Sequence, residues 1–445
     1  MGIMISILLW SVATSTAAAT LEVGPNKTFA RVEEAVAAAA PGDIIEVFPL
    51  PNGEPYTAVG VLVDKPGLII RAAGGPGARR VTLSGQGFEH SGRGRIPRAI
   101  VQFDPGADGG VLDGFELTGA SNRTDNGAGV RINQANRVVI RNCDIHHNDM
   151  GIMSNGNGTP STAAGQVIEH SAIHNNGDDR LSGFNHNLYL GGTSATLRFC
   201  DVHQARTGHN IKSRAHFIRV EYSYVHGSAN REFDLVDSDD TARPGADAIL
   251  IGNIIVKAPR HPGNRGVIHF GQDVGGERNG TLYLIHNTVV TSYISPVVDL
   301  SSRHARAELI GNIIDDGGKP RRNQVLGAGS RGQATASAIT GTHNWLAPGF
   351  ANRLAQTGMD AADNTIAEES RRLYLAPEQH DYRLREPWYD IVGAGRALRS
   401  IRLPATPEDG TAEPELRRQY LHPLRKQPRP LADPPDLGAI GVVRR

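Results

Sequence analysis

The residues with the clearest chemical potential lie in two copies of one short pattern, HNLYL from His186 and HNIKS from His209. Side chains alternate between the two faces of a strand, and this alternation places Tyr189 and Lys212 on the outer face. If the two copies stack as neighbouring parallel strands, these two side chains lie about 4.8 Å apart. The pattern therefore predicts a polar, cationic patch on the surface of a sheet.

The same alternation assigns the other polar side chains of the two copies. Asn187, Asn210 and Arg214 take the outer parity, and His186 and His209 take the inner one. We expect the asparagines to hold the carboxylate or ring hydroxyls of a substrate. The two histidines are predicted to stack at a corner of the fold, and His209 is the better functional candidate because its strand carries the lysine.

Lys212 is notable because this chain uses arginine almost everywhere. Only six of its 46 basic residues are lysine. Arginine keeps its proton near neutral pH, whereas a lysine beside other cations can lose it. Uronate β-elimination needs a base for the C5 proton, a cation for the neighbouring carboxylate and a proton for the O4 leaving group. We expect Lys212 to be the base, Arg214 to pair the carboxylate and Tyr189 to protonate O4.

An acidic cluster follows on the next strand, at Asp234, Asp237, Asp239 and Asp240. The oxygens of these side chains could bind Ca²⁺, but we favour the interpretation that they form an acidic turn. We therefore expect that the protein requires no cofactor, with bound Ca²⁺ as the alternative. Inverting hydrolysis could draw on the first two acids, although their opposite parities separate them. Asp234 itself has outer parity, as does His269 two coils beyond the lysine, and both are candidates for substrate binding.

These side chains need a scaffold that repeats one strand at regular intervals. Segments of the LIGNII type recur with spacings of roughly two to three dozen residues, as in the coils of a solenoid. They begin at Leu112, Ile140, Ile168, Leu197, Val220, Leu250, Leu284 and Leu309. A second strand lies between successive copies, and HNLYL and HNIKS belong to that set.

The fourth position of each segment predicts a file of inward-pointing side chains. This file contains Phe115, Cys143, Ser171, Cys200, Ser223, Asn253, Asn287 and Asn312. Its three asparagines would form a ladder of side-chain amides. The two cysteines are two coils apart, about 9.6 Å, which exceeds the reach of a disulfide, so we expect buried thiols.

The N-terminal region predicts an export signal followed by a helix. The apolar run from Ile3 to Ala13 is followed by small residues and is shorter than the ~20 residues of a membrane span. It predicts a cleaved signal peptide and a secreted or periplasmic protein. Thr28 is the expected N-cap of a helix with apolar residues at helical spacing, which Pro41 and Gly42 end.

The segment GPNKTFARVEEAVAAAAPGDIIEV, the coil repeat with its asparagine column and the closing DLGAIG near Asp436 resemble right-handed parallel β-helix proteins of the pectate-lyase-like superfamily. The resemblance implies an all-β solenoid with an N-terminal capping helix. It also implies a secreted protein that acts on polysaccharide along the outer face of one parallel sheet. The residue orders typical of galacturonan hydrolases and of alginate C5-epimerases are missing.

We therefore predict a signal peptide at 1–19, a β-helix with its cap at 21–345, and an irregular segment at 346–445 packed along the solenoid. The formal net charge of +0 gives no overall field that would favour nucleic acid or membrane. We expect a monomeric polysaccharide lyase that cleaves an acidic, uronate-containing polysaccharide. The alternatives are an inverting glycoside hydrolase, a C5-epimerase and a non-catalytic glycan-binding surface protein.

Overall fold

The structure is a computed structural model that describes residues 17–74, 80–260, 263–331, 334–397, 400–405, 416–430 and 432–442. The apolar run assigned to the signal peptide lies outside these residues. Within them, no helix combines the length and the apolar character needed to cross a bilayer.

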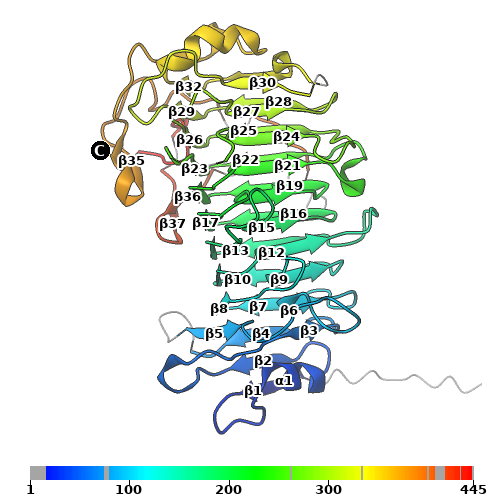
Figure 1. The fold of residues 1–445 in the computed structure, drawn as a ribbon. Coiled ribbons are helices and arrows are strands. Elements are labelled where there is room, and N and C mark those ends of the chain that lie inside the picture. The colour runs from blue at the N-terminus through cyan, green and yellow to red at the C-terminus, as the bar shows by residue number, and fades with distance from the viewer. Residues whose placement is uncertain are drawn as a thin grey trace, which may run out of the picture.

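The chain folds as a right-handed parallel β-helix, in which successive turns add strands to three long parallel sheets (Figure 1). Sheet A contains, in spatial order, β1 (Thr20–Val23), β2 (Ile44–Val47), β4 (Ile69–Ala72), β7 (Val111–Asp113), β10 (Val139–Arg141), β13 (Gln166–Glu169), β16 (Ser194–Arg198), β19 (Phe217–Glu221), β22 (Ala248–Ile251), β25 (Thr281–Ile285), β28 (Arg306–Ile310) and β31 (Ile339–Thr342). The predicted fold class is confirmed.

The other two sheets run alongside sheet A. Sheet B contains β5 (Val81–Ser84), β8 (Phe115–Thr118), β11 (Asp144–His146), β14 (Ala172–His174), β17 (Asp201–His203), β20 (Tyr224–His226), β23 (Ile254–Val256), β26 (Thr288–Val290), β29 (Ile313–Asp315), β32 (Trp345–Leu346) and β33 (Thr365–Ile366). Sheet C contains β3 (Val61–Val63), β6 (Ala99–Phe103), β9 (Ala128–Asn133), β12 (Met150–Asn155), β15 (Leu188–Leu190), β18 (Ile211–Ser213), β21 (Phe233–Val236), β24 (Ile268–Gly271), β27 (Val298–Leu300) and β30 (Gly327–Gly329).

The predicted repeat coincides with the register of sheet A. Leu112 pairs with Ile140, Ile140 pairs with Ile168, and the pairing continues coil by coil to Leu309. Each repeat segment nevertheless contains two strands. A residue with positive φ separates its sheet A strand from its sheet B strand, as at Tyr222 (φ 45°). The corner turns the next side chain into the core.

That next side chain belongs to the predicted inward file, all of whose members are buried. Asn253 Nδ2 donates to Asn287 Oδ1 at 3.0 Å, and Asn287 Nδ2 donates to Asn312 Oδ1 at 3.1 Å. The ladder continues upward through Asn344 and Asn364. Both cysteines are free and buried, and burial raises the pKa of each thiol to about 12.

The inner face of sheet C is a continuous aliphatic and aromatic stack. Leu188, Ile211, Phe233 and Ile268 pair in register on successive strands and are at most 1% exposed. Removing such side chains from water stabilises the coil by about 25 cal/mol per Å² of apolar surface. Because alternate residues must point the other way, this stack fixes which side chains face outward.

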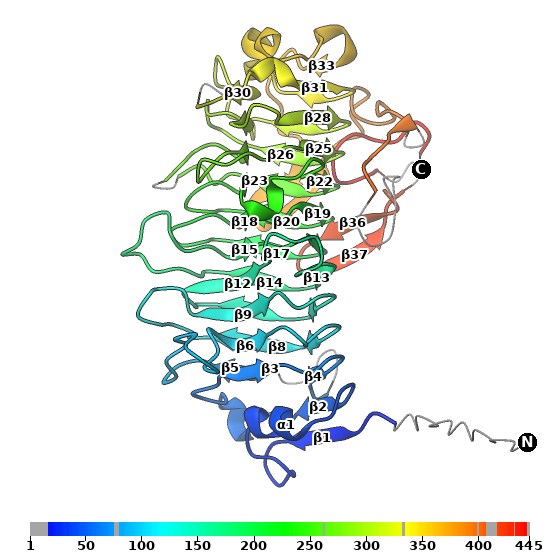
Figure 2. The same ribbon diagram turned by 90° about the vertical axis from the view of Figure 1, so that its right-hand side faces the viewer.

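Helix α1 (Val32–Ala38) lies at the N-terminal end of the stack, where it contacts β1, β2 and β3 (Figure 2). It begins later than the N-cap predicted at Thr28. The reason is that Phe29 forms a parallel bridge with Val23, and its N–H donates to Glu22 O at 3.1 Å. Extended backbone therefore persists up to the start of the helix.

The solenoid also extends past the predicted boundary at residue 345, because β32 pairs with β33. Beyond it, β34 (Tyr374–Ala376) and β35 (Asp381–Leu384) form one antiparallel hairpin, and β36 (Arg418–Leu421) and β37 (Arg425–Pro428) form another. Short 3-10 helices lie at η1 (Pro51–Gly53), η2 (Asp239–Thr241), η3 (Ala336–Ala338), η4 (Pro348–Gln356), η5 (Ala361–Asp363) and η6 (Pro377–Gln379).

The C-terminal hairpins lie along the side of the solenoid (Figures 1 and 2). Tyr420 Oη donates to Asp201 Oδ2 at 3.3 Å on sheet B, and His286 Nδ1 lies 3.0 Å from Asp436 O at the corner between sheets A and B. Ile401, Leu403 and Leu416 pack against apolar side chains on the outer face of sheet A. These contacts fall on sheets A and B.

Candidate active site

Four adjacent strands of sheet C place four polar side chains in one outward column. In the register of β15, β18, β21 and β24, Tyr189 pairs with Lys212, Lys212 with Asp234, and Asp234 with His269. The predicted stacking of the tyrosine on the lysine is confirmed, and so is the position of the histidine two coils further on.

Lys212 of this column and the nearby Arg214 converge on a carboxylate that the sequence did not indicate. Lys212 Nζ lies 2.9 Å from Asp273 Oδ2, and Arg214 Nη2 lies 2.6 Å from the same oxygen. Arg214 Nε also donates to Tyr189 Oη at 2.8 Å. We call Tyr189, Lys212, Arg214, Asp234 and Asp273 the groove cluster.

Asp234 is the buried counter-ion of the groove cluster. Its carboxylate lies 2.9 Å from His269 Nδ1, 3.1 Å from Arg231 Nη1 and 3.4 Å from both His209 Nε2 and Lys212 Nζ. Burial alone would raise the pKa of Asp234, but the surrounding histidines and the lysine outweigh burial and hold it well below its ordinary value. The residue is therefore a fixed negative charge.

Asp273 is the more accessible carboxylate, with 31% of its side chain exposed. Burial raises the pKa of Asp273, but the hydrogen bond and the charge of Lys212 have a larger, opposite effect. The net shift of the pKa is therefore downward. Asp237 fixes the loop that carries it, since its carboxylate accepts the backbone N–H groups of Asp273, Val274 and Gly276. The one sequence signal for this loop was a Gly-rich turn directly after the strand of His269.

The two histidines of the repeated pattern stack as predicted, with ring centroids 5.1 Å apart. His209 N–H donates to His186 Nδ1 at 3.0 Å, and Arg231 N–H donates to His209 Nδ1 at 3.2 Å. Burial lowers the pKa of His209 to about 4. Both ring nitrogens of His209 are engaged, because Nε2 faces Asp234. It therefore has no free lone pair with which to act as a base.

The prediction that Asn187 and Asn210 face the groove is wrong, because both side chains are fully buried. Asn187 Nδ2 donates to Asn210 Oδ1 at 2.8 Å, and Asn210 Nδ2 donates to Glu232 Oε2 at 2.6 Å. Both asparagines precede the first residue of their strands, at a corner where strand alternation does not apply. They form a second internal ladder, which ends in the buried ion pair of Glu232 and Lys257.

His269 links Asp234 to a buried hydroxyl. Its Nδ1 faces the carboxylate, and its Nε2 lies 2.6 Å from Ser301 Oγ. A carboxylate only accepts, so Nδ1 carries the proton and the serine donates to Nε2. This order of groups resembles a nucleophilic triad. Ser301 is fully buried and also accepts the N–H of Gln272, so the arrangement holds the loop in place and offers no nucleophile to the groove.

The acidic cluster does not fit a Ca²⁺ site. Asp237 is saturated by backbone N–H groups, and Asp240 accepts the N–H groups of Gly158 and Gly192. Asp234 is already surrounded by cations. Within the described part of the chain, no group of three or more His, Cys, Asp or Glu side chains is arranged to hold a metal ion. The acids proposed for inverting hydrolysis are therefore engaged elsewhere.

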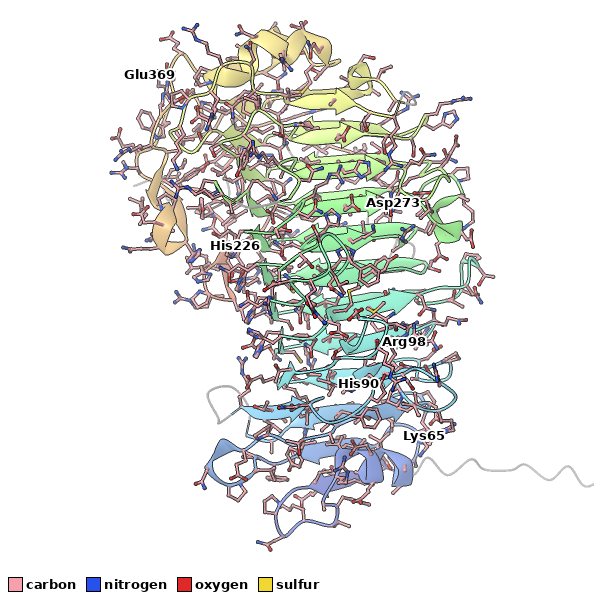
Figure 3. The ribbon with its side chains drawn as sticks, in the orientation of Figure 1. Lys65, His90, Arg98, His226, Asp273 and Glu369 are labelled. Carbon is pink, nitrogen blue, oxygen red and sulfur yellow. The ribbon has the colours of Figure 1, made fainter. Side chains whose placement is uncertain are left out.

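The outward column continues below the groove cluster along sheet C. Tyr189 pairs with Met153, Met153 with Arg131, and Arg131 with Gln102. Figure 3 shows Asp273 and Arg98 toward the same side of the stack, whereas His226 lies toward the side of the C-terminal hairpins. The outward column thus runs over several coils and is polar except at Met153, with a spacing of about 4.8 Å per coil.

No protein-family model matches this sequence, and a search of curated proteins finds no match. Several solved structures align with it at low identity. Pectate lyase Pel9A is 13% identical, with 96% of this chain and 97% of that chain covered and a TM-score of 0.49. The polygalacturonase from Erwinia carotovora ssp. carotovora is 9% identical, with 81% and 96% covered and a TM-score of 0.42.

A third alignment, to pectin methylesterase PemA from Erwinia chrysanthemi, has 11% identity, covers 66% of this chain and 81% of that chain, and has a TM-score of 0.35. The three proteins carry out different reactions, and alignments at these identities transfer none of them to this chain. The parallel β-helix fold therefore rests on the three sheets of the chain itself.

Proposed function

We propose that this protein cleaves an acidic polysaccharide by β-elimination in the groove on sheet C. One observation carries the proposal: Lys212 and Arg214 converge on a single, partly exposed carboxylate oxygen, that of Asp273. A uronate carboxylate brings the same charge and the same geometry, and an arginine binds it through charge-assisted hydrogen bonds. In this proposal Asp273 marks the position at which a substrate carboxylate is neutralised.

The roles follow from the hydrogen bonds of the groove cluster. Arg214 neutralises the substrate carboxylate, which makes the C5 proton removable. An incoming sugar first displaces Asp273 from Lys212, and the ammonium of Lys212 releases a proton to solvent. The resulting neutral amine then takes the C5 proton. The C5–H electron pair becomes the C4–C5 double bond while the C4–O4 bond breaks. Tyr189 then protonates O4, because its oxygen already accepts from Arg214 and its own proton is free to donate.

The column supports a polymeric substrate. Arg131 lies two coils below Tyr189 on the same face, so a sugar chain lying along sheet C meets cations at more than one subsite. Asp234 keeps the cationic residues in position without contacting the sugar. The protein is proposed to work as an exported monomer without a required cofactor, and addition of Ca²⁺ or of a chelator tests the latter point.

The experiment is to incubate the full chain with a panel of uronate polymers and follow the ultraviolet absorbance of the conjugated product. An elimination reaction raises absorbance, hydrolysis produces only reducing ends, C5-epimerisation exchanges the C5 hydrogen with solvent, and a binding protein does none of these. The Lys212→Ala variant is expected to abolish the rise in absorbance. Reducing ends without absorbance would overturn the proposal.

A further inference from the structure

A cavity of about 540 Å³ lies between sheet B and the hairpin of β34 and β35. Its floor is the outer face of three successive strands, where Val256, Val290 and Asp315 pair in register. Tyr374 and Tyr382 of the hairpin and Glu378 of the turn between its strands also line it. Small-molecule sites in proteins commonly have volumes of about 300–1,000 Å³. The cavity is on a different sheet from the groove cluster and shares no residue with it.

Two polar groups deep in this cavity are incompletely hydrogen-bonded within the described part of the chain. Asp315 is 1% exposed and Tyr374 is 4% exposed. Among the residues that the structure describes, only the backbone N–H groups of Asp316 and Gly317 approach the Asp315 carboxylate, without good hydrogen-bond geometry, and the Tyr374 hydroxyl has no hydrogen-bond partner. Burial and the charge of Asp316 raise the pKa of Asp315 to about 7. Buried polar groups are ordinarily hydrogen-bonded, so a molecule that enters the cavity, either a ligand or water, can complete the hydrogen bonds of these two.

The neighbouring carboxylate is not in the same situation. Asp316 Oδ1 accepts the N–H of Gly318 at 2.8 Å, and Oδ2 accepts the hydroxyl of Ser370. Only one carboxylate of the pair is therefore available to a ligand. A divalent cation would need several oxygen ligands close together, and within the described part of the chain no three His, Cys, Asp or Glu side chains are arranged to hold one.

The cavity wall also presents exposed cations. Lys319 and Arg372 line it and are exposed, and neither forms a salt bridge with any described residue. Two other arginines are already engaged: Arg371 pairs with Asp390 at 2.9 Å, and Arg385 donates to a backbone carbonyl. The exposed Glu378 also lines the cavity, so its one negative charge offsets one of the two free cations. The cavity thus combines a buried hydrogen-bonding end with a net positive charge where it meets solvent.

We propose that this cavity binds a sugar acid of one or two rings. Ring hydroxyls donate to the Asp315 carboxylate and exchange hydrogen bonds with the Tyr374 hydroxyl, while the acid group of the ligand meets Lys319 and Arg372. The aromatic and aliphatic walls contact the apolar faces of the ring. The site is a second saccharide site, and its existence does not depend on elimination chemistry in the groove.

The test is calorimetric titration of the full chain with galacturonate and glucuronate, with galactose and glucose as neutral controls. The acids are expected to bind, and Asp315→Asn and Arg372→Gln are each expected to weaken binding by about tenfold or more. Thermal melting verifies that both variants fold. Arg383→Gln is the matched control, because this exposed arginine of the same hairpin pairs with Asp381 and does not line the cavity.

The Lys212→Ala variant separates this site from the groove. Binding of the monosaccharide acids that survives Lys212→Ala and is lost in Asp315→Asn supports the cavity, whatever the polymer assay shows. Binding lost only in Lys212→Ala places the ligand in the groove and overturns the inference. Equal binding of neutral sugars, or no binding of any sugar, also overturns it, since water alone then satisfies the buried groups.

Discussion

At the scale of single residues, the groove cluster is a balanced set of charges. Lys212 and Arg214 share Asp273, and Asp234 is held by further cations. In such a set, replacing one cationic side chain by another leaves the charge unchanged but alters the ability of the side chain to accept a proton. Lysine can accept a proton after losing one, whereas arginine cannot under ordinary conditions.

Lys212→Arg therefore tests whether the lysine is the base. If it is, the variant keeps the charge but loses turnover by about 10²–10⁴-fold. The measurement is the initial rate of absorbance increase on the active polymer. If the rate is nearly that of the wild type, Lys212 only neutralises charge. In that case the base is Tyr189, because both nitrogens of His209 are occupied.

Tyr189→Phe tests the proton donor. It removes one hydroxyl and leaves the ring beside Lys212 and Arg214, whose charged groups lie 5.8 Å from the ring centroid. We expect kcat to fall by about 10²-fold or more with little change in KM, because protonation of O4 occurs only in the transition state. A rise in KM with unchanged kcat would assign the hydroxyl to substrate binding.

At the scale of elements, two internal ladders fix the corners of the coil. One contains Asn253, Asn287 and Asn312, and the other contains Asn187 and Asn210. Each amide satisfies backbone groups that the turn between two strands would otherwise leave unpaired in a dry interior. The ladder of Asn187 and Asn210 therefore helps to fix the stacking of strands β15 and β18, and with it the position of the groove cluster.

Asn287→Ala is expected to destabilise the protein by about 1–3 kcal/mol or more, since it leaves buried amide groups of the neighbouring coils without partners. Asn287 Nδ2 donates to Leu250 O at 2.8 Å, and Asn253 N–H donates to Asn287 Oδ1 at 3.0 Å. The measurement is the midpoint of denaturant unfolding. The matched control is the exposed Asn352→Ala, for which we expect a change within about 0.5 kcal/mol. Equal effects would show that the ladder does not contribute.

At the scale of the whole molecule, the described contacts of the C-terminal segment with the solenoid include contacts on sheets A and B, whereas the groove cluster lies on sheet C. One attachment point of the C-terminal segment is a buried histidine. His286 Nδ1 donates to Asp436 O at 3.0 Å, and its Nε2 has no partner among the described residues. Burial lowers the pKa of His286 to about 3, with a further contribution from the charge of Arg429.

This attachment predicts a dependence on pH. The unfolded histidine titrates near ~6.5 and the folded one near about 3, so the unfolded state binds more protons between these values. The stability that His286 contributes is present above pH ~6.5 and is lost as the pH falls toward 3, by about 1.4 kcal/mol per pKa unit. In thermal melts, His286→Asn should therefore lose less stability than the wild type on acidification.

Asparagine suits this test because Asn142 occupies the equivalent corner of an earlier coil with a similar positive φ. The control is His343→Asn, which removes an exposed imidazole from the equivalent corner of a later coil. If both variants change the pH dependence equally, burial of His286 is not its cause.

The sequence by itself determined the coil repeat, the inward file and the stacking of Tyr189 on Lys212. These features depend on alternation and on a spacing that neighbouring coils repeat, and both can be read along the chain. It did not reveal that each repeat segment bends between two strands. Only some of the bend residues are glycine, and others, such as Tyr222, take positive φ because the coil around them requires it.

Only the tertiary structure decided that Asn187 and Asn210 point inward and that Asp273 lies beside Lys212. The asparagines lie one residue before their strands, so a corner rather than a pleat sets their direction. Asp273 reaches Lys212 from a loop 61 residues away in sequence, held there by Asp237 and Ser301. Alternation along a strand predicts which side chains are neighbours on a sheet. The position of a loop depends instead on hydrogen bonds to residues that become neighbours only when the coils stack.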